Sequence, residues 1–265
     1  MPSHGCFDKL GQRGQGTLTN VITALADGRL LAEKTGSTPP TVVAMHGWGR
    51  TGRDFTEVVD GLDALSIHLP GFGITPEPLE AWGSDRYADE VADALSGMPP
   101  VILLGHSFGG RVAVRLAAKH PHLVRGIVLT GVPLLRLAPP AQPSFTYRTV
   151  RFLAKVGLIS RAQLEAQKQR RGSSDYRAAS GVMRDILVKV IGEDYRDDLA
   201  KITVPVRMVW GEHDVAAPTD AGRAASKLIP TATFRTVPGA EHLLEGDLRV
   251  AVREELLTLI EEVGA

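Results

Sequence analysis

The stretch Val-Ile-Leu-Leu-Gly-His-Ser-Phe-Gly-Gly at residues 101–110 decides the fold. Its four leading apolar residues predict a buried strand, and the run from Arg111 to His120, stopped by Pro121, predicts a helix. Between them, Gly-His-Ser-Phe-Gly matches the Gly-X-Ser-X-Gly pattern, in which a serine occupies a sharp turn from strand to helix. Such a turn raises the Ser107 side chain above the sheet edge, and the helix N-terminus behind it favours developing negative charge. Ser107 is therefore a candidate nucleophile.

Strands and helices alternate on both sides of this unit. Asp27-Gly28 predicts a tight antiparallel hairpin between strands at 17–24 and 30–34. Further strands are predicted at 41–45, 64–69, 126–130, 204–210 and 233–237. Helices are predicted at 53–61, at 85–95 with Ser84 as the N-cap, at 218–229 and at 248–262. This alternation predicts an α/β fold with a mostly parallel, doubly wound sheet.

The pattern changes between Pro133 and Thr203. Three prolines open this stretch, and helical segments at about 147–156, 160–171 and 180–191 follow without an intervening strand. The chain is therefore expected to have a core formed by residues 1–133 and 204–265 and a helical insertion over 134–203.

Composition narrows the class of protein. The 265 residues are 43% hydrophobic, and 30 basic residues balance 30 acidic ones, so no excess charge points to nucleic acid or an anionic membrane surface. The one cysteine, Cys6, allows no internal disulfide, and we find neither a signal peptide nor a run of apolar residues that could span a membrane. We expect a cytoplasmic protein with no nucleic-acid or membrane partner; its oligomeric state is open.

The sequence also predicts no metal and no cofactor. It has no Cys-X-X-Cys or His-Glu-X-X-His spacing. The segment Gly71-Phe-Gly73 is not a dinucleotide-binding fingerprint, because the third glycine of that motif is missing and the segment does not follow the first strand of a parallel unit.

Two partners for Ser107 follow later strands. A serine hydroxyl needs a base to take its proton, and that base needs an acid to orient it. Asp214 follows the predicted strand at 204–210, and His242 follows the strand at 233–237. This is the order Ser, Asp, His at three strand ends that meet at one edge of a parallel sheet.

The assignment has rivals. Glu212 and Asp220 are alternative acids, and an Asx turn is the structural alternative for Asp214. Of the eight histidines, only His242 has the downstream position that the base needs.

Four segments together resemble the α/β-hydrolase-fold superfamily, in particular its cap-bearing, esterase-like serine hydrolases. They are His46-Gly-Trp-Gly49, the Ser107 turn, the loop 211–214 and the loop 239–242. The resemblance implies an eight-stranded sheet, a cap or lid formed by 134–203, and an oxyanion hole made by the backbone N–H groups of Trp48 and Phe108. His68 departs from it, because many relatives have an aspartate at that position.

The function expected is hydrolysis of a small, uncharged or weakly charged acyl substrate, by resemblance most often a carboxylic ester, through an acyl-enzyme on Ser107. Carbon–carbon bond hydrolysis, lactone hydrolysis, acyl transfer and perhydrolysis could use the same three residues. A non-catalytic small-molecule-binding protein is the alternative from another class. Candidate pocket residues, for which packing or loop orientation is the competing role, are His46, Leu134, Leu135, Phe145 and Phe152.

Overall fold

The computed structural model describes residues 21–137, 160 and 173–265. Within these residues, eight strands form one sheet in the order β1-β2-β4-β3-β5-β6-β7-β8. The first two strands pair antiparallel, and β3 to β8 run parallel to one another. This confirms the mostly parallel eight-stranded sheet. The strands are β1 (Val21–Leu25), β2 (Leu30–Thr35), β3 (Val42–Met45), β4 (Ala64–His68), β5 (Val101–His106), β6 (Val124–Thr130), β7 (Val206–Gly211) and β8 (Ala232–Val237).

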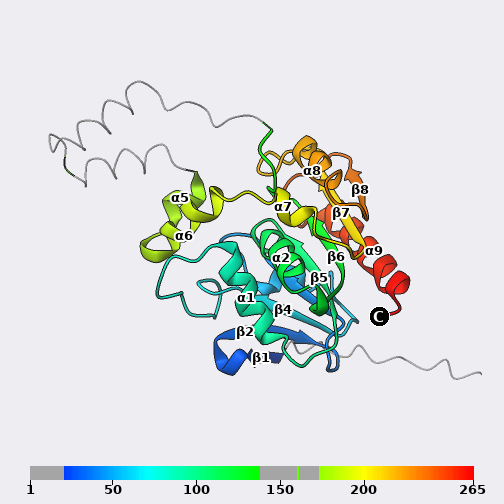
Figure 1. The fold of residues 1–265 in the computed structure, drawn as a ribbon, viewed down its shortest axis with the longest axis horizontal. Helices are drawn as coiled ribbons and strands as arrows, with labels where there is room; N and C mark the ends of the chain where they lie inside the picture. Colours follow the sequence, from blue (N-terminus) through cyan, green and yellow to red (C-terminus); the bar gives the residue numbers. More distant parts are fainter. Residues whose placement is uncertain (1–20, 138–159, 161–172) are drawn as a thin grey trace, which may run out of the picture.

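Helices cover both faces of the sheet (Figure 1). The helices α1 (Ser84–Ala94), α2 (Phe108–Lys119) and α8 (Thr219–Ser226) contribute to one buried cluster. The long helix α9 (Gly246–Val263) contributes to the cluster on the other face. The sheet is therefore doubly wound, as the alternation predicts.

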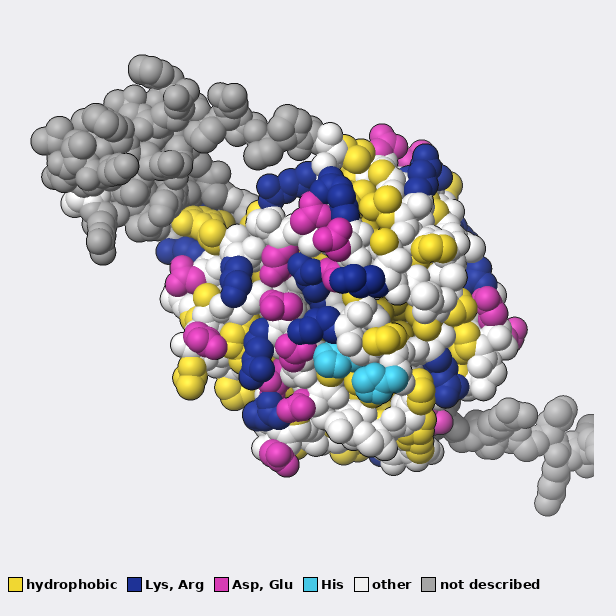
Figure 2. Space-filling view, viewed as in Figure 1, with side chains coloured by type: hydrophobic (Ala, Val, Ile, Leu, Met, Phe, Trp, Pro, Cys, Tyr) yellow, Lys and Arg dark blue, Asp and Glu magenta, His cyan; other side chains and the backbone are white. Residues whose placement is uncertain are grey.

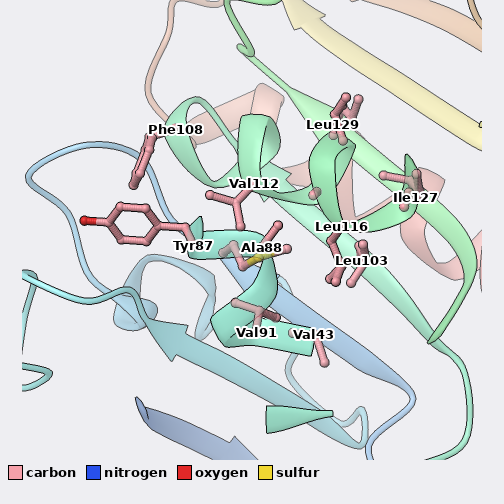
Figure 3. Close-up of a cluster of buried hydrophobic side chains, with 14 of the residues drawn as sticks. Val43, Tyr87, Ala88, Val91, Leu103, Phe108, Val112, Leu116, Ile127 and Leu129 are labelled. Atoms are coloured by element: carbon pink, nitrogen blue, oxygen red, sulfur yellow. The ribbon is translucent and has the colours of Figure 1, made fainter. Parts of the chain in front are cut away.

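The two-residue period of the strands divides the core between these faces. Figure 3 shows Val43, Leu103, Ile127 and Leu129 packed beside Tyr87, Val112 and Leu116 of the first two helices. Their neighbours along the strands, such as Ile102 and Val128, belong to the opposite cluster with α9. Because central strands are buried on both sides, they read as continuous apolar runs in the sequence.

Two local predictions are wrong. Gly83, not Ser84, is the N-cap of α1, because the Ser84 hydroxyl donates to the carboxylate of Glu193 and lies inside the first turn. The stretch 53–61 forms a short 3₁₀ segment, η2 (Gly52–Phe55), and turns instead of a helix. Its apolar side chains are buried all the same, so packing rather than helical hydrogen bonding fixes it.

The described part of the 134–203 segment is helical. It contains α5 (Ser174–Ala178), α6 (Gly181–Ile191) and α7 (Arg196–Leu199). The expected helix at 180–191 is confirmed as α6, whereas the expected helices at 147–156 and 160–171 lie outside the described residues, apart from Ser160. Met183 of α6 lies against Gly71 in the loop after β4, so this helix packs at the carboxyl edge of the sheet.

Charges of both signs are interspersed on the surface. On the face drawn in Figure 2, Lys and Arg side chains alternate with Asp and Glu. This matches the equal numbers of basic and acidic residues in the chain.

Candidate active site

Ser107 occupies a strained turn between β5 and α2. Its φ of 50° and ψ of −111° lie in a region that side chains other than glycine rarely adopt. The turn is held from two sides: Ser107 N donates to Thr130 O of β6 at 3.0 Å, and Gly109 N donates to His46 O at 2.9 Å. A Cβ at Gly109 would collide with the carbonyl of Met45, so only glycine allows this approach.

Asp214 and His242 form a hydrogen-bonded pair. The Nδ1 atom of His242 lies 2.8 Å from Oδ2 of Asp214. The other carboxylate oxygen, Oδ1, accepts the backbone N–H groups of Ala216 at 2.9 Å and Ala217 at 2.7 Å. Asp214 therefore forms an Asx turn through Oδ1 and pairs with His242 through Oδ2. With Nδ1 committed to the carboxylate, Nε2 is the nitrogen of His242 that remains for chemistry.

The pair lies over the end of β6. Gly131, the residue after that strand, has a φ of +59°, and a Cβ there would lie 3.0 Å from the His242 ring and 3.1 Å from Asp214 Oδ2. The side chain of Asp214 is fully buried, whereas 21% of the His242 side chain is exposed. Asp214 is thus shielded from water, whereas His242 reaches the surface.

The backbone N–H groups of Trp48 and Phe108 have no acceptor in the described part of the chain. By contrast, the N–H groups of Gly110 and Arg111, further along α2, both donate to Ser107 O. Phe108 is the first residue of α2, where N–H groups point out of the helix. Both residues line the same cavity as Ser107, so their N–H groups are the candidate donors of the site.

An aromatic cluster supports these two residues. The Trp48 and Phe108 rings pack edge to face, with centroids 5.4 Å apart. Phe72 packs edge to face on Trp48 at 4.9 Å, and Tyr87 on Phe108 at 5.0 Å. Burial raises the pKa of the Tyr87 hydroxyl, which donates to Pro70 O and stays neutral. The cluster fixes the side chains, and through them the backbone, of both candidate donors.

Two buried histidines organise the loops around Ser107. His46 accepts the N–H of Leu69 on Nε2 at 3.0 Å, and its Nδ1 lies 2.7 Å from Gly47 O. His106 donates from Nε2 to the backbone carbonyl of His242 at 3.0 Å. Burial lowers the pKa of each to about 4, so both rings are neutral at pH 7. They are structural members of the site, and His106 ties the Ser107 turn to the loop that carries His242.

The rival acids and histidines lie elsewhere. Glu212 is exposed and accepts the N–H of Gly239, and Asp220 is exposed in the first turn of α8. His68 is buried against Glu33, and His120 pairs with Asp89. His213 and His122 are exposed, and His4 lies outside the described residues.

A cavity of ≈ 960 Å³ opens over Ser107 and His242. Of the five predicted pocket residues, Leu135 lines this cavity. The two candidate oxyanion-hole residues, Trp48 and Phe108, line it as well. His46 and Leu134 lie behind its wall, because His46 is engaged in the backbone bonds above and Leu134 is buried in the core. Phe145 and Phe152 lie outside the described residues.

Three arginines that were not predicted from the sequence also line this cavity: Arg50, Arg111 and Arg136. One signal was available for Arg111, which stands four residues after Ser107 and so on the same face of the helix. Arg50 directly follows the segment His46–Gly49, which the sequence analysis already placed at the site, whereas no pattern in the sequence indicates that Arg136 lines the cavity.

Within the described ranges, no group of three or more His, Cys, Asp or Glu side chains could hold a metal ion. Nor does any helix in those ranges combine the length and the apolar character needed to cross a bilayer.

Comparison with known proteins gives the family. A family model described as alpha/beta hydrolase fold matches residues 40–244. The pimeloyl-[acyl-carrier protein] methyl ester esterase of Chromobacterium violaceum is 27% identical over 227 residues, which cover 77% of this chain and 87% of that protein. The non-heme chloroperoxidase CPO-A1 of Kitasatospora aureofaciens is 25% identical over 231 residues, covering 76% of this chain and 84% of that one.

Solved structures agree on the fold. The esterase EaEST from Exiguobacterium antarcticum has a TM-score of 0.68 and 21% identity, over 92% of this chain and 100% of that chain. The sheet order, the strained serine turn and the family match lead to one conclusion. This chain belongs to the alpha/beta hydrolase fold family.

Proposed function

We propose that this protein, a hydrolase of the alpha/beta hydrolase fold, cleaves carboxylic esters of small acyl groups through an acyl-enzyme on Ser107. The observation that carries the proposal is the hydrogen bond between His242 Nδ1 and Asp214 Oδ2, beside a cavity that Ser107 and His242 both line. The esterase from Chromobacterium violaceum, similar over most of this chain, supports an ester as the substrate.

In the proposed mechanism, His242 Nε2 takes the proton from the Ser107 hydroxyl as its oxygen attacks the substrate carbonyl carbon. Asp214 keeps the other proton on Nδ1 and stabilises the imidazolium that forms. The ester C–O bond then breaks, and the alkoxide leaves with the proton from Nε2. Water, deprotonated by the same nitrogen, attacks the acyl-enzyme and releases the acid and free Ser107.

The oxyanion of both tetrahedral intermediates would rest on the N–H groups of Trp48 and Phe108. Support for this comes from their lack of another acceptor in the described part of the chain and from the rigid aromatic cluster behind them. Donors that are already oriented need no reorganisation during the reaction, and one such donor contributes about 3–4 kcal/mol in comparable sites.

We further propose that residues 134–203 form a cap over a core of 1–133 and 204–265. The cavity supports this division, since residues of the Ser107 turn line it together with Leu187, Val190 and Ile191 of α6. The cap would then set the shape of the acyl site.

The test is turnover of p-nitrophenyl esters from acetate to octanoate, together with labelling by a fluorophosphonate. We expect hydrolysis of the shorter esters and a single label on Ser107, both lost in Ser107→Ala. Ser96→Ala is the matched control, because it removes an exposed serine that does not line the cavity and should change neither. Absence of turnover at every chain length, with an unlabelled Ser107, would overturn the proposal and favour a binding protein.

Perhydrolysis is the second candidate, and the chloroperoxidase from Kitasatospora aureofaciens is the observation that favours it. Here hydrogen peroxide would replace water, attack the acyl-enzyme and leave as the peracid. Assays with and without hydrogen peroxide separate the two acceptors: an esterase releases acid at an unchanged rate, whereas a perhydrolase releases peracid.

A further inference from the structure

The cavity over Ser107 has a basic lining that ester hydrolysis by itself does not require. Three arginines and a single acidic residue, Asp175, are among its described lining residues. Arg50 is neutralised by Asp54, which accepts its Nε at 2.6 Å and its second terminal nitrogen at 3.1 Å. Within the described ranges, no carboxylate lies at ion-pairing distance from Arg111 or Arg136.

Arg111 is a half-buried cation one helical turn from the candidate nucleophile. One of its terminal nitrogens donates to Val190 O at 2.6 Å, and its guanidinium lies 5.7 Å from the centre of the Tyr195 ring. The nearby Glu193 carboxylate is engaged by the hydroxyls of Ser84 and Tyr195. Burial lowers the pKa of Arg111, yet a guanidinium remains charged, so this cation is partly desolvated and has no counter-ion in contact among the described residues.

Arg136, in the segment that follows β6, contacts the same C-terminal end of α6 as Arg111. It is exposed, follows β6 after five intervening residues, and donates to the carbonyl of Ile191. Both arginines thus hold one of the last carbonyls of α6, where the negative end of the helix dipole favours cations. Each guanidinium has five N–H donors, so a single backbone bond leaves most of them available.

These observations point to an anion-binding subsite. We propose that Arg111 and Arg136 bind a carboxylate carried by the substrate, so that the preferred substrate is a monoester of a short dicarboxylic acid. The inference rests on the proposed function, since it names the substrate class of the same cavity. The backbones of Ser107 and Arg111 are about 6 Å apart along the axis of α2, from a rise of about 1.5 Å per residue, and both residues line the same cavity, so we infer that a short acyl chain separates the carboxylate from the scissile carbonyl. The weakly charged substrate expected from the sequence is replaced here by an anionic one.

The rival role for the two arginines is purely structural, as clamps on the end of α6. A clamp predicts that their removal slows all esters equally and lowers the melting temperature. A carboxylate site predicts that removal slows only the esters that carry a carboxylate. The neutral ester therefore serves as the internal reference.

The first experiment compares kcat/KM for the p-nitrophenyl monoesters of glutaric and adipic acid with those for the butyrate and hexanoate esters. We expect the wild-type enzyme to favour the monoesters of the diacids by at least tenfold, and Arg136→Gln and Arg111→Gln to lose roughly tenfold to a hundredfold of that preference. Lys189→Gln is the matched control, because it removes one positive charge from the last turn of α6 but lies outside the cavity lining. Equal kcat/KM for acidic and neutral esters in the wild-type enzyme would overturn the inference and leave the esterase proposal intact.

The second experiment does not depend on turnover. Titration calorimetry of Ser107→Ala with monomethyl adipate and with methyl hexanoate compares two esters of similar length, of which only the first carries a carboxylate. We expect monomethyl adipate to bind at least tenfold more tightly, with an affinity that falls as salt is raised and is lost in Ser107→Ala/Arg136→Gln. Equal binding of the two esters would refute the subsite even if the protein hydrolysed no ester, whereas tighter binding of monomethyl adipate would support it.

Discussion

Replacing Asp214 by asparagine tests the candidate triad at the point where the structure is most specific. Asparagine has nearly the same shape, but one of its two polar ends donates hydrogen bonds instead of accepting them. In the protein, Oδ1 of Asp214 accepts two backbone N–H groups and Oδ2 faces His242 Nδ1. The orientation of the new amide is therefore decided by the two backbone donors.

If the asparagine NH₂ faced Ala216 and Ala217, two pairs of donors would oppose each other. The carbonyl oxygen must therefore take the Oδ1 position, which turns the NH₂ group towards His242. His242 Nδ1 then has to accept, its proton moves to Nε2, and the nitrogen that should deprotonate Ser107 is already protonated. We expect kcat to fall about 10⁴-fold, the scale of the same change in a serine protease triad, or about 5 kcal/mol in activation free energy.

The assay is hydrolysis of p-nitrophenyl butyrate, with thermal unfolding as the check on the fold. The melting temperature should stay close to the wild-type value, because asparagine keeps both backbone hydrogen bonds. Glu212→Gln is the control: the side chain of this exposed residue accepts the N–H of Gly239, and the amide oxygen of glutamine can accept it as well, so the rate should change less than threefold. A Glu212→Gln enzyme slower than Asp214→Asn, or Asp214→Asn within tenfold of wild type, would refute the assignment.

Three further outcomes are expected. Ser107→Gly should abolish activity yet raise the melting temperature by about 2 °C in differential scanning calorimetry, because glycine relieves the strain at φ 50°; Ser107→Ala, which keeps the Cβ, should show no rise. Gly131→Ala should lower kcat roughly tenfold to a hundredfold with little change in KM, since the added methyl group displaces the His242 ring; unchanged steady-state kinetics would contradict this. Burial lowers the pKa of His46 and His106 to about 4, so the unfolded chain binds more protons than the folded one between pH 4 and 6.5. The contribution of these rings to the free energy of unfolding is therefore fully present above pH 6.5. It declines below that pH by roughly 1 kcal/mol per pH unit for each ring. Urea unfolding at pH 7 and pH 5 measures this slope, which His106→Gln should reduce. An equal slope in the variant would show that His106 does not contribute to the pH dependence of stability.

The candidate triad was predictable because it depends on features that a sequence displays directly. Parallel strands end at one edge of a sheet, so a serine, an acid and a histidine that follow three such strands must converge. Ser107, Asp214 and His242 needed no knowledge of distances, only the order of strands and the turn chemistry around them. The sheet could also be predicted from the sequence, because its central strands are buried on both faces and therefore read as apolar runs.

The lining of the cavity was less predictable, because it depends on where one segment packs on another. His46 reads as a residue of the cavity wall, yet the N–H of Leu69, distant in sequence, holds its ring behind that wall. Ser84 reads as an N-cap, but its hydroxyl bonds Glu193, which lies 109 positions further along the chain. Arg111 and Arg136 contact α6 because this helix returns to the sheet edge, and no local periodicity encodes that return.

The way in which α6 is held has a consequence for divergence among relatives. Arg111 and Arg136 contact this helix through the carbonyls of Val190 and Ile191, which every amino acid supplies. Side chains of α6 that face the cavity can therefore be exchanged while the attachment is retained. Specificity at the proposed acyl site can then drift, or be redesigned by saturation mutagenesis of Leu187 and Ile191, without re-engineering the anchor.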